Sequence, residues 1–198
     1  MRAAPLTTKI SFVPRALAAI ALLRRFDPGA DERATHSLAR TLALLERVPQ
    51  PFSRRTFAPG HMTASGIVLS ADAAQVLLIF HRRLKRWLQP GGHVEPEDAD
   101  LPAAAEREVR EETGVALDET LPRVVVGVDV HEIPARDPDE PPHVHHDVVF
   151  RFRALPGTQP DPEQGRDVVW CGVDELDRYE VDEPLKRSVL RALREPMA

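Results

Sequence analysis

Apolar residues in the first sixty positions recur at helical spacing. Residues three and four apart lie on one face of an α-helix, so this pattern predicts two amphipathic helices, over 14–26 and about 31–48. The sequence Asp27-Pro28-Gly29 separates them, and several prolines between 49 and 59 end the second. The apolar positions of the two predicted helices are Leu17, Ile20, Ala21 and Leu23, then Leu38, Leu42 and Leu45.

From about residue 61 the apolar runs become short and are separated by polar turns. Runs of this length predict strands, whereas the longer segments 100–113 and 183–194 keep the helical period. Asp100 can cap the first of these helices and Gly114 can end it. Strands and helices do not alternate regularly, which favours an α+β fold with a mixed sheet. The predicted strands are 64–69, 75–81, 121–130, 147–154 and 168–171.

Composition places the chain among soluble globular proteins. Of its 198 residues 42% are apolar, enough for a core, and no apolar segment is long enough to span a membrane. A net charge of −5 argues against nucleic-acid binding, which needs many cationic contacts to phosphates. The lone Cys171 offers no internal disulfide, so we expect a cytoplasmic protein. The basic run Arg82, Arg83, Lys85 and Arg86 suits a small anionic ligand.

The segment 107–115 carries an unusual density of negative charge. On a helix, Glu108, Glu111 and Glu112 lie at i, i+3 and i+4, so their carboxylates share one face and repel one another. A solvated helix surface is the ordinary interpretation of such a run. A divalent cation would remove the repulsion, because Mg²⁺ and Mn²⁺ take oxygen ligands and leave positions for phosphate oxygens.

A glycine pair precedes this helix. Gly91 and Gly92 allow a backbone to approach closely and expose its carbonyls. Ala104 and Ala105, one turn before Glu108, allow another backbone to pack against the helix. The loop and the helix can therefore contribute to one site.

Taken together, residues 90–115, PGGHVEPEDADLPAAAEREVREETGV, resemble the Nudix box, G-x5-E-x7-R-E-U-x-E-E-x-G-U with U aliphatic. The second half of the pattern matches completely. In the first half Asp98 stands where the family has Glu, and eight residues instead of seven separate it from Arg107. The looser similarity runs from about 61 to 176. It implies a Nudix-type α/β/α sandwich over 61–198, with residues 1–60 as an added helical extension that forms a lid, a dimer surface or a cover for the sheet.

The resemblance also implies a reaction. Nudix enzymes use Mg²⁺ or Mn²⁺ to hydrolyse a diphosphate linkage in a nucleoside diphosphate joined to another group. By position, Glu108 and Glu112 would be the main metal ligands, with Glu111 and the Gly91 carbonyl as further ligands, and Arg107 would orient the carboxylates. A Nudix-fold domain that binds a nucleotide without hydrolysing it is the alternative. The sequence selects no particular base or sugar.

Two further regions are candidates for the site. In many family members a glutamate beyond the box acts as the base, and Glu163, in the loop 157–165, is the candidate here, with Asp167 second. Strand alternation puts His143, His145 and Asp147 on one face with Arg151. That face is open to three interpretations: a zinc site, a phosphate- or base-binding cleft, or solvated surface. The predicted substrate-binding residues are Arg82, Arg86, His145 and Arg151.

Overall fold

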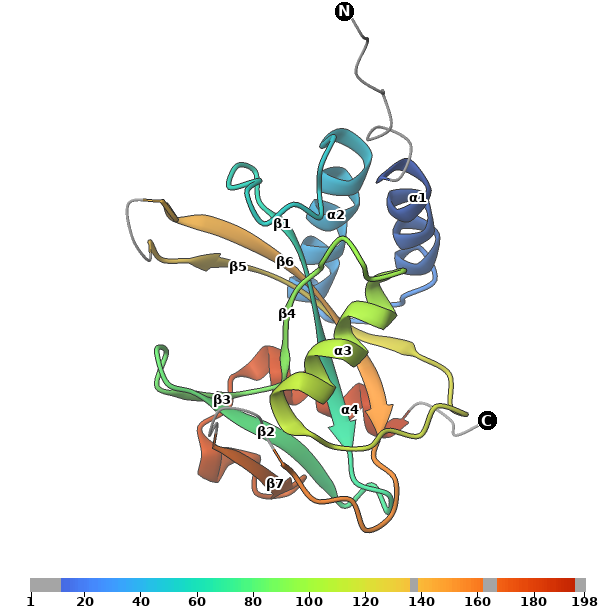
Figure 1. Ribbon diagram of the computed structural model, residues 1–198, viewed down its shortest axis with the longest axis vertical. Helices are drawn as coiled ribbons and strands as arrows, with labels where there is room; N and C mark the ends of the chain where they lie inside the picture. The colour runs from blue at the N-terminus through green and yellow to red at the C-terminus, as the bar shows by residue number, and fades with distance from the viewer. Residues whose placement is uncertain (1–11, 136–138, 162–166, 195–198) are drawn as a thin grey trace, which may run out of the picture.

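The computed structural model describes residues 12–135, 139–161 and 167–194. These residues form four α-helices, seven strands and one short 3-10 helix (Figure 1). The helices are α1 (Phe12–Leu23), α2 (Glu32–Arg47), α3 (Leu101–Thr113), η2 (Leu176–Tyr179) and α4 (Glu183–Arg194). The strands are β1 (His61–Leu69), β2 (Gln75–His81), β3 (Arg86–Leu88), β4 (Gly91–His93), β5 (Val124–Ile133), β6 (His143–Arg153) and β7 (Val168–Gly172).

The strands form one mixed sheet, which confirms the predicted α+β class. Its main path runs β3-β2-β1-β6-β5, while β4 pairs with β1 and β7 pairs with β2. The β1–β6 pair is parallel and in register from His61 opposite His145 to Leu69 opposite Arg153, and the other pairs are antiparallel. The first residues of β1, from His61 to Thr63, therefore lie beside the histidine-rich start of β6.

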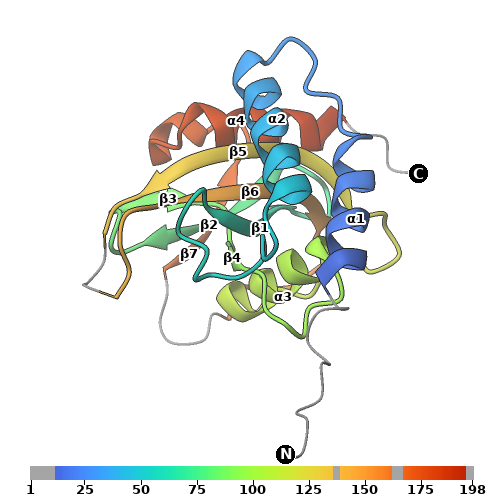
Figure 2. The same ribbon diagram turned by 90° about the horizontal axis from the view of Figure 1, so that it is seen from above.

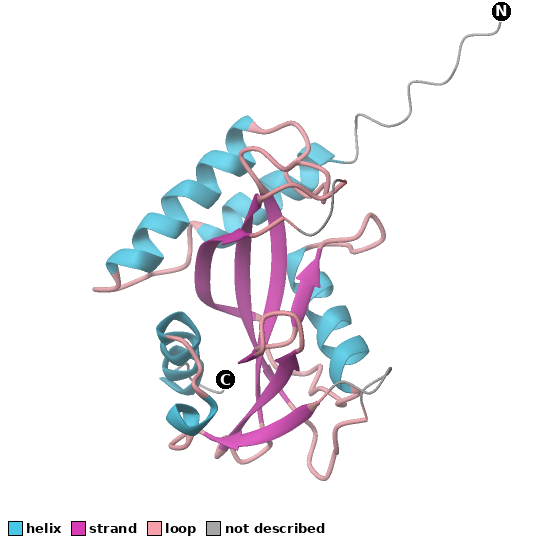
Figure 3. Ribbon diagram, turned by 90° about the vertical axis from the view of Figure 1, so that its left-hand side faces the viewer, coloured by secondary structure: helices cyan, strands magenta, loops and turns pink. Residues whose placement is uncertain are grey.

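Helices cover both faces of the sheet. Helix α4 lies on one side and α3 on the other (Figures 2 and 3), which gives the predicted α/β/α layering. All nine residues of β1 are buried because both of its faces are covered. Within the described residues, no helix is both long and apolar enough to cross a bilayer.

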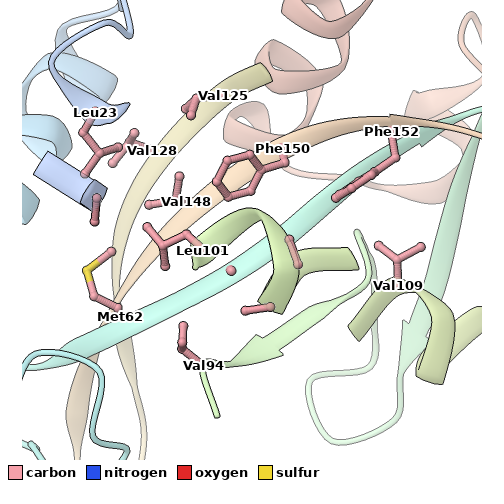
Figure 4. Close-up of a cluster of buried hydrophobic side chains, with 14 of the residues drawn as sticks. Leu23, Met62, Val94, Leu101, Val109, Val125, Val128, Val148, Phe150 and Phe152 are labelled. Atoms are coloured by element: carbon pink, nitrogen blue, oxygen red, sulfur yellow. The ribbon is translucent and has the colours of Figure 1, made fainter. Parts of the chain in front are cut away.

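The larger hydrophobic cluster lies between the sheet and helices α1, α2 and α3. Phe150 and Phe152 of β6 pack there with Val109 of α3 and Leu23 of α1 (Figure 4). On the opposite face, Val149 of β6 packs with Val189 of α4 in a second cluster. The amino-terminal helices therefore share a core with the sheet that they cover.

An ion-pair cluster fastens α2 to α4. Asp31 is the N-cap of α2 and accepts a hydrogen bond from the Ala34 amide. Its other carboxylate oxygen lies 2.9 Å from Arg191 Nη2 and 3.2 Å from Arg187 Nε, both on α4. The cap of one helix is thus also a contact to another layer of the fold.

Candidate active site

Helix α3 carries the acidic residues, and its ends are defined as the sequence predicted. The Asp100 side chain accepts a hydrogen bond from the Ala103 amide, and Gly114 ends the helix in the left-handed region at φ 66°. A side chain at Gly114 would meet the Asp161 carbonyl oxygen at 2.2 Å. Both ends being fixed, the carboxylates of the last two turns have a defined position relative to β4.

The glycine pair allows β4 to lie between β1 and α3. A Cβ at Gly91 would stand 2.3 Å from the Ser65 Cβ in β1, and a Cβ at Gly92 would stand 2.6 Å from Glu108 Oε1 in α3. Side chains at these two positions would therefore push the strand away from β1 and displace Glu108. The Gly91 amide also donates a hydrogen bond of 2.9 Å to Glu112 Oε2, which orients that carboxylate.

Arg107 donates hydrogen bonds to most of the acidic side chains of the site. Its Nη1 donates to Glu108 Oε1 at 3.0 Å and to Glu111 Oε2 at 2.9 Å. Its Nε donates to Asp98 Oδ1 at 2.9 Å, and its Nη2 donates to the His93 carbonyl oxygen at 2.9 Å. Asp98, with eight residues between it and Arg107, reaches the guanidinium directly. These anionic partners, and above all the Asp98 hydrogen bond, raise the Arg107 pKa further above its ordinary value.

The three glutamates differ in exposure. The Glu112 residue is buried, Glu108 is nearly so, and the Glu111 side chain is 56% exposed. Burial raises the pKa of Glu108, while the neighbouring Arg107 opposes that rise. A buried carboxylate that gains stability from nearby positive charge is suited to a cation. With oxygen donors alone in this set, the hard cations Mg²⁺ and Mn²⁺ fit better than a soft metal.

A comparison with protein-family models covers most of the chain. A NUDIX domain model matches residues 60–193 of the chain, which contain the box, all seven strands and α3. The chain belongs to the NUDIX family. No curated protein matches it significantly.

Solved structures of several hydrolases are similar to this chain at low sequence identity. The dihydroneopterin triphosphate pyrophosphohydrolase of E. coli superposes with a TM-score of 0.51 at 18% identity, covering 68% of this chain and 96% of that one. For a C. elegans Ap4A hydrolase in a binary complex the TM-score is 0.45 at 16% identity, and the match covers 67% of this chain and 95% of that one. For a MutT structure from a study of Aliivibrio salmonicida and Vibrio cholerae the TM-score is 0.44 at 20% identity, and the match covers 65% of this chain and 95% of that one.

The other predicted site residues that the structure describes lie at the turn between β2 and β3, in β6 and just before β7. Arg82 and Arg86 are exposed at the turn between β2 and β3, and Arg86 Nη2 lies 3.2 Å from Asp182 Oδ2. Arg151 is buried in β6, on the same face as Val149. Glu163 lies outside the residues that the structure describes. Asp167 is exposed just before β7.

The histidine-rich face of β6 is largely buried, so its interpretation as solvated surface is wrong. His143 is 4% exposed and Asp147 is 5% exposed. Both carboxylate oxygens of Asp147 accept hydrogen bonds, from the Thr63 and Ser65 hydroxyls. Burial is the main cause that raises the pKa of Asp147, while the hydrogen bonds from Ser65 and Thr63 oppose the rise.

The sequence did not reveal two other members of this face. His61 of β1 and His93 of β4 lie beside His145, with ring centroids 4.8 Å and 5.2 Å from it. Burial and nearby positive groups lower the pKa of His61 and of His93 to about 4 and that of His145 to about 2. The three imidazoles are therefore uncharged at neutral pH. Their meeting depends on strand register, for which the sequence carries no local pattern.

Proposed function

We propose that the protein is a divalent-metal-dependent hydrolase that cleaves a diphosphate linkage in a nucleoside diphosphate derivative. The observation that carries the proposal is the arrangement on α3 and β4. There, Glu108 and Glu112 lie against the glycine pair, and one guanidinium spans Glu108 and Glu111. Buried like charges are costly unless something compensates them, so a helix with no ligand would gain nothing by keeping this set.

The donor set fits Mg²⁺ or Mn²⁺. Glu108, Glu112 and the Gly91 carbonyl would hold the cation, with Glu111 as a further ligand. When bound, such a cation neutralises phosphate charge and lowers the pKa of an attacking water. Arg107 positions the carboxylates, and it is itself held by Asp98 and the His93 carbonyl oxygen. The Gly91 amide holds Glu112 in the orientation that faces β4.

Residues outside the box would complete substrate binding. Arg82 and Arg86 are exposed and cationic, which suits them to the non-reacting phosphate, although Arg86 would have to exchange its contact with Asp182. Arg151 is buried and is not available to a ligand in this conformation. His145 lies in the histidine cluster on the sheet face that bears Asp147. Glu163 remains our proposed base.

The test is a screen for turnover. Purified protein is incubated with Mg²⁺ or Mn²⁺ and nucleoside triphosphates, dinucleoside polyphosphates, ADP-ribose, NADH and sugar nucleotides, and the phosphorylated products are separated and identified. We expect metal-dependent cleavage between two phosphorus atoms in at least one compound. Nucleotide binding without turnover of any compound would support the non-catalytic alternative instead.

A further inference from the structure

Three histidines from three strands bring their ring nitrogens together on one face of the sheet. His61, His93 and His145 each offer one nitrogen, and these atoms all lie within 4.8 Å of one another. In the part of the chain that the structure describes, no other histidine, cysteine or acidic side chains meet this condition in a group of three or more. Register explains the meeting, since His61 lies opposite His145 and His93 lies opposite Thr63, two residues along β1.

His61 supplies an independent observation. The residue is 0% exposed, and its Nδ1 lies 3.2 Å from the Thr56 carbonyl oxygen. A carbonyl only accepts, so Nδ1 carries the proton and Nε2 carries the lone pair. Among the described residues, no group forms a hydrogen bond with this buried Nε2. Leaving a buried nitrogen without a partner is unfavourable, and a ligand on that lone pair would offset the cost.

The hydrogen bond from His61 Nδ1 to Thr56 is also typical of a metal-binding histidine. Histidines that bind metals usually donate the other ring N–H to a carbonyl or carboxylate, which fixes the tautomer and the ring orientation. His61 shows this arrangement with Thr56. His143, beside the group, donates from Nδ1 to the Pro141 carbonyl oxygen at 2.9 Å, and its Nε2 lies 3.1 Å from His145 Nε2. His145 is thus held at the edge of the group by a neighbouring ring.

The cluster is separate from the glutamates of α3. Successive side chains of a strand point to opposite faces, and a side chain at Gly92 would point at Glu108. The next residue, His93, therefore directs its ring to the other face of β4, while its backbone carbonyl contacts Arg107. A ligand on the imidazoles and a cation on the carboxylates would lie on opposite sides of this short strand.

We propose that His61, His93 and His145 form a second metal site, which binds Zn²⁺ through three imidazoles. Three uncharged nitrogen donors suit zinc and disfavour Mg²⁺, which takes oxygen. Zn–N bonds of about 2.0–2.1 Å in a tetrahedron place the nitrogens about 3.3 Å apart, so small ring rotations would close the group around the ion. Three protein ligands leave the fourth position to water or to an anionic ligand. The site does not depend on the proposed hydrolase activity.

Zinc binding to the full chain tests the proposal. Protein stripped with a chelator and then dialysed is titrated with Zn²⁺ in a calorimeter, and with Co²⁺ in a spectrophotometer, because tetrahedral Co²⁺ absorbs visible light. We expect one high-affinity Zn²⁺ per chain in the presence of excess Mg²⁺, and visible Co²⁺ bands that Zn²⁺ abolishes. His145→Asn and His93→Asn should each weaken zinc binding at least about tenfold.

Matched variants separate this site from other histidines and from the glutamates. His36→Asn removes an exposed histidine of α2, and Glu112→Gln alters the box; both should bind Zn²⁺ as the wild type does. Circular dichroism establishes that each variant is folded. The proposal is overturned if stoichiometric binding is absent. It is equally overturned if folded His145→Asn and His93→Asn bind Zn²⁺ as the wild type does, or if Glu112→Gln abolishes binding.

Discussion

At the scale of single residues, Gly91 and Gly92 are adjacent but limit different neighbours. A side chain at 91 would collide with the Ser65 Cβ and Cα, which belong to the central strand β1. The atoms nearest to a side chain at 92 would be those of the Glu108 carboxylate, at the end of a flexible side chain. One glycine is therefore required by the packing of the sheet and the other by the position of an acidic group.

This difference predicts opposite outcomes for two alanine variants. Gly91→Ala should lower the free energy of unfolding by about 2 kcal/mol or more, because backbone atoms of two strands must separate. Gly92→Ala should change it by less than about 1 kcal/mol, yet weaken Mn²⁺ binding because Glu108 must move. Urea denaturation and the paramagnetic resonance signal of free Mn²⁺ provide the two measurements. Equal stabilities together with equal Mn²⁺ affinities would contradict the geometry.

At the scale of elements, the sequence predicts those features whose determining residues lie within one short segment. Helix α3 and its glutamates were predicted because the cap, the final glycine and the i, i+3, i+4 spacing all lie within one segment. Strands β3 and β4 were missed because three residues show no periodicity. The strands predicted at 64–69 and 147–154 begin at His61 and His143 in the structure; the prediction starts them too late because these buried residues are polar. The histidine cluster was missed because it arises from pairing between distant strands.

Helix α2 offers a prediction about its N-cap. Asp31→Ala removes both the cap and the contacts to Arg187 and Arg191, whereas Asp31→Asn keeps an oxygen acceptor for the Ala34 amide. We expect Asp31→Ala to cost about 1–3 kcal/mol of unfolding free energy, and Asp31→Asn to cost less. Denaturant titrations of both variants give the values.

The same residue gives a pH dependence. Burial raises the Asp31 pKa, but the Ala34 amide and the two arginines outweigh that effect, so its folded-state pKa lies below the ordinary value of an aspartate. A depressed carboxyl pKa stabilises the fold above the unfolded-state pKa, and this contribution is lost as pH falls through the folded-state pKa. The difference in unfolding free energy between the wild type and Asp31→Asn should therefore become smaller at acid pH. A gap that widens there would refute the assignment.

At the scale of the whole molecule, the sheet holds several histidines uncharged. Burial is the main reason that the pKa values of His61, His93 and His146 fall to about 4 and that of His145 to about 2. His131 differs: burial lowers its pKa, but the hydrogen bond to Asp129 and nearby carboxylates raise it overall. The pKa is lowered in four of these histidines and raised in one, so the stability of the fold should decrease in acid.

The sign of the resulting stability change follows from proton uptake. Below about pH 6.5 the unfolded chain protonates these four histidines while the folded chain does not, so stability falls as pH decreases toward about 4. His131 opposes the trend because its folded form binds its proton more tightly. We expect a net loss of more than about 1 kcal/mol per pH unit in this window, measured by urea denaturation with a chelator present. Constant stability between about pH 7 and about pH 5 would show that the histidines are not buried as described.

The most direct test of the proposed activity is the rate of metal-dependent hydrolysis by Glu112→Gln beside the wild type, on whichever diphosphate the screen identifies. Glu119→Gln, which changes an exposed glutamate that contacts Arg110, is the matched control. We predict a loss of at least about 100-fold in the rate for Glu112→Gln with its fold intact, and no loss for Glu119→Gln. Equal rates for folded Glu112→Gln and the wild type would contradict the assignment of the acidic helix to the reaction.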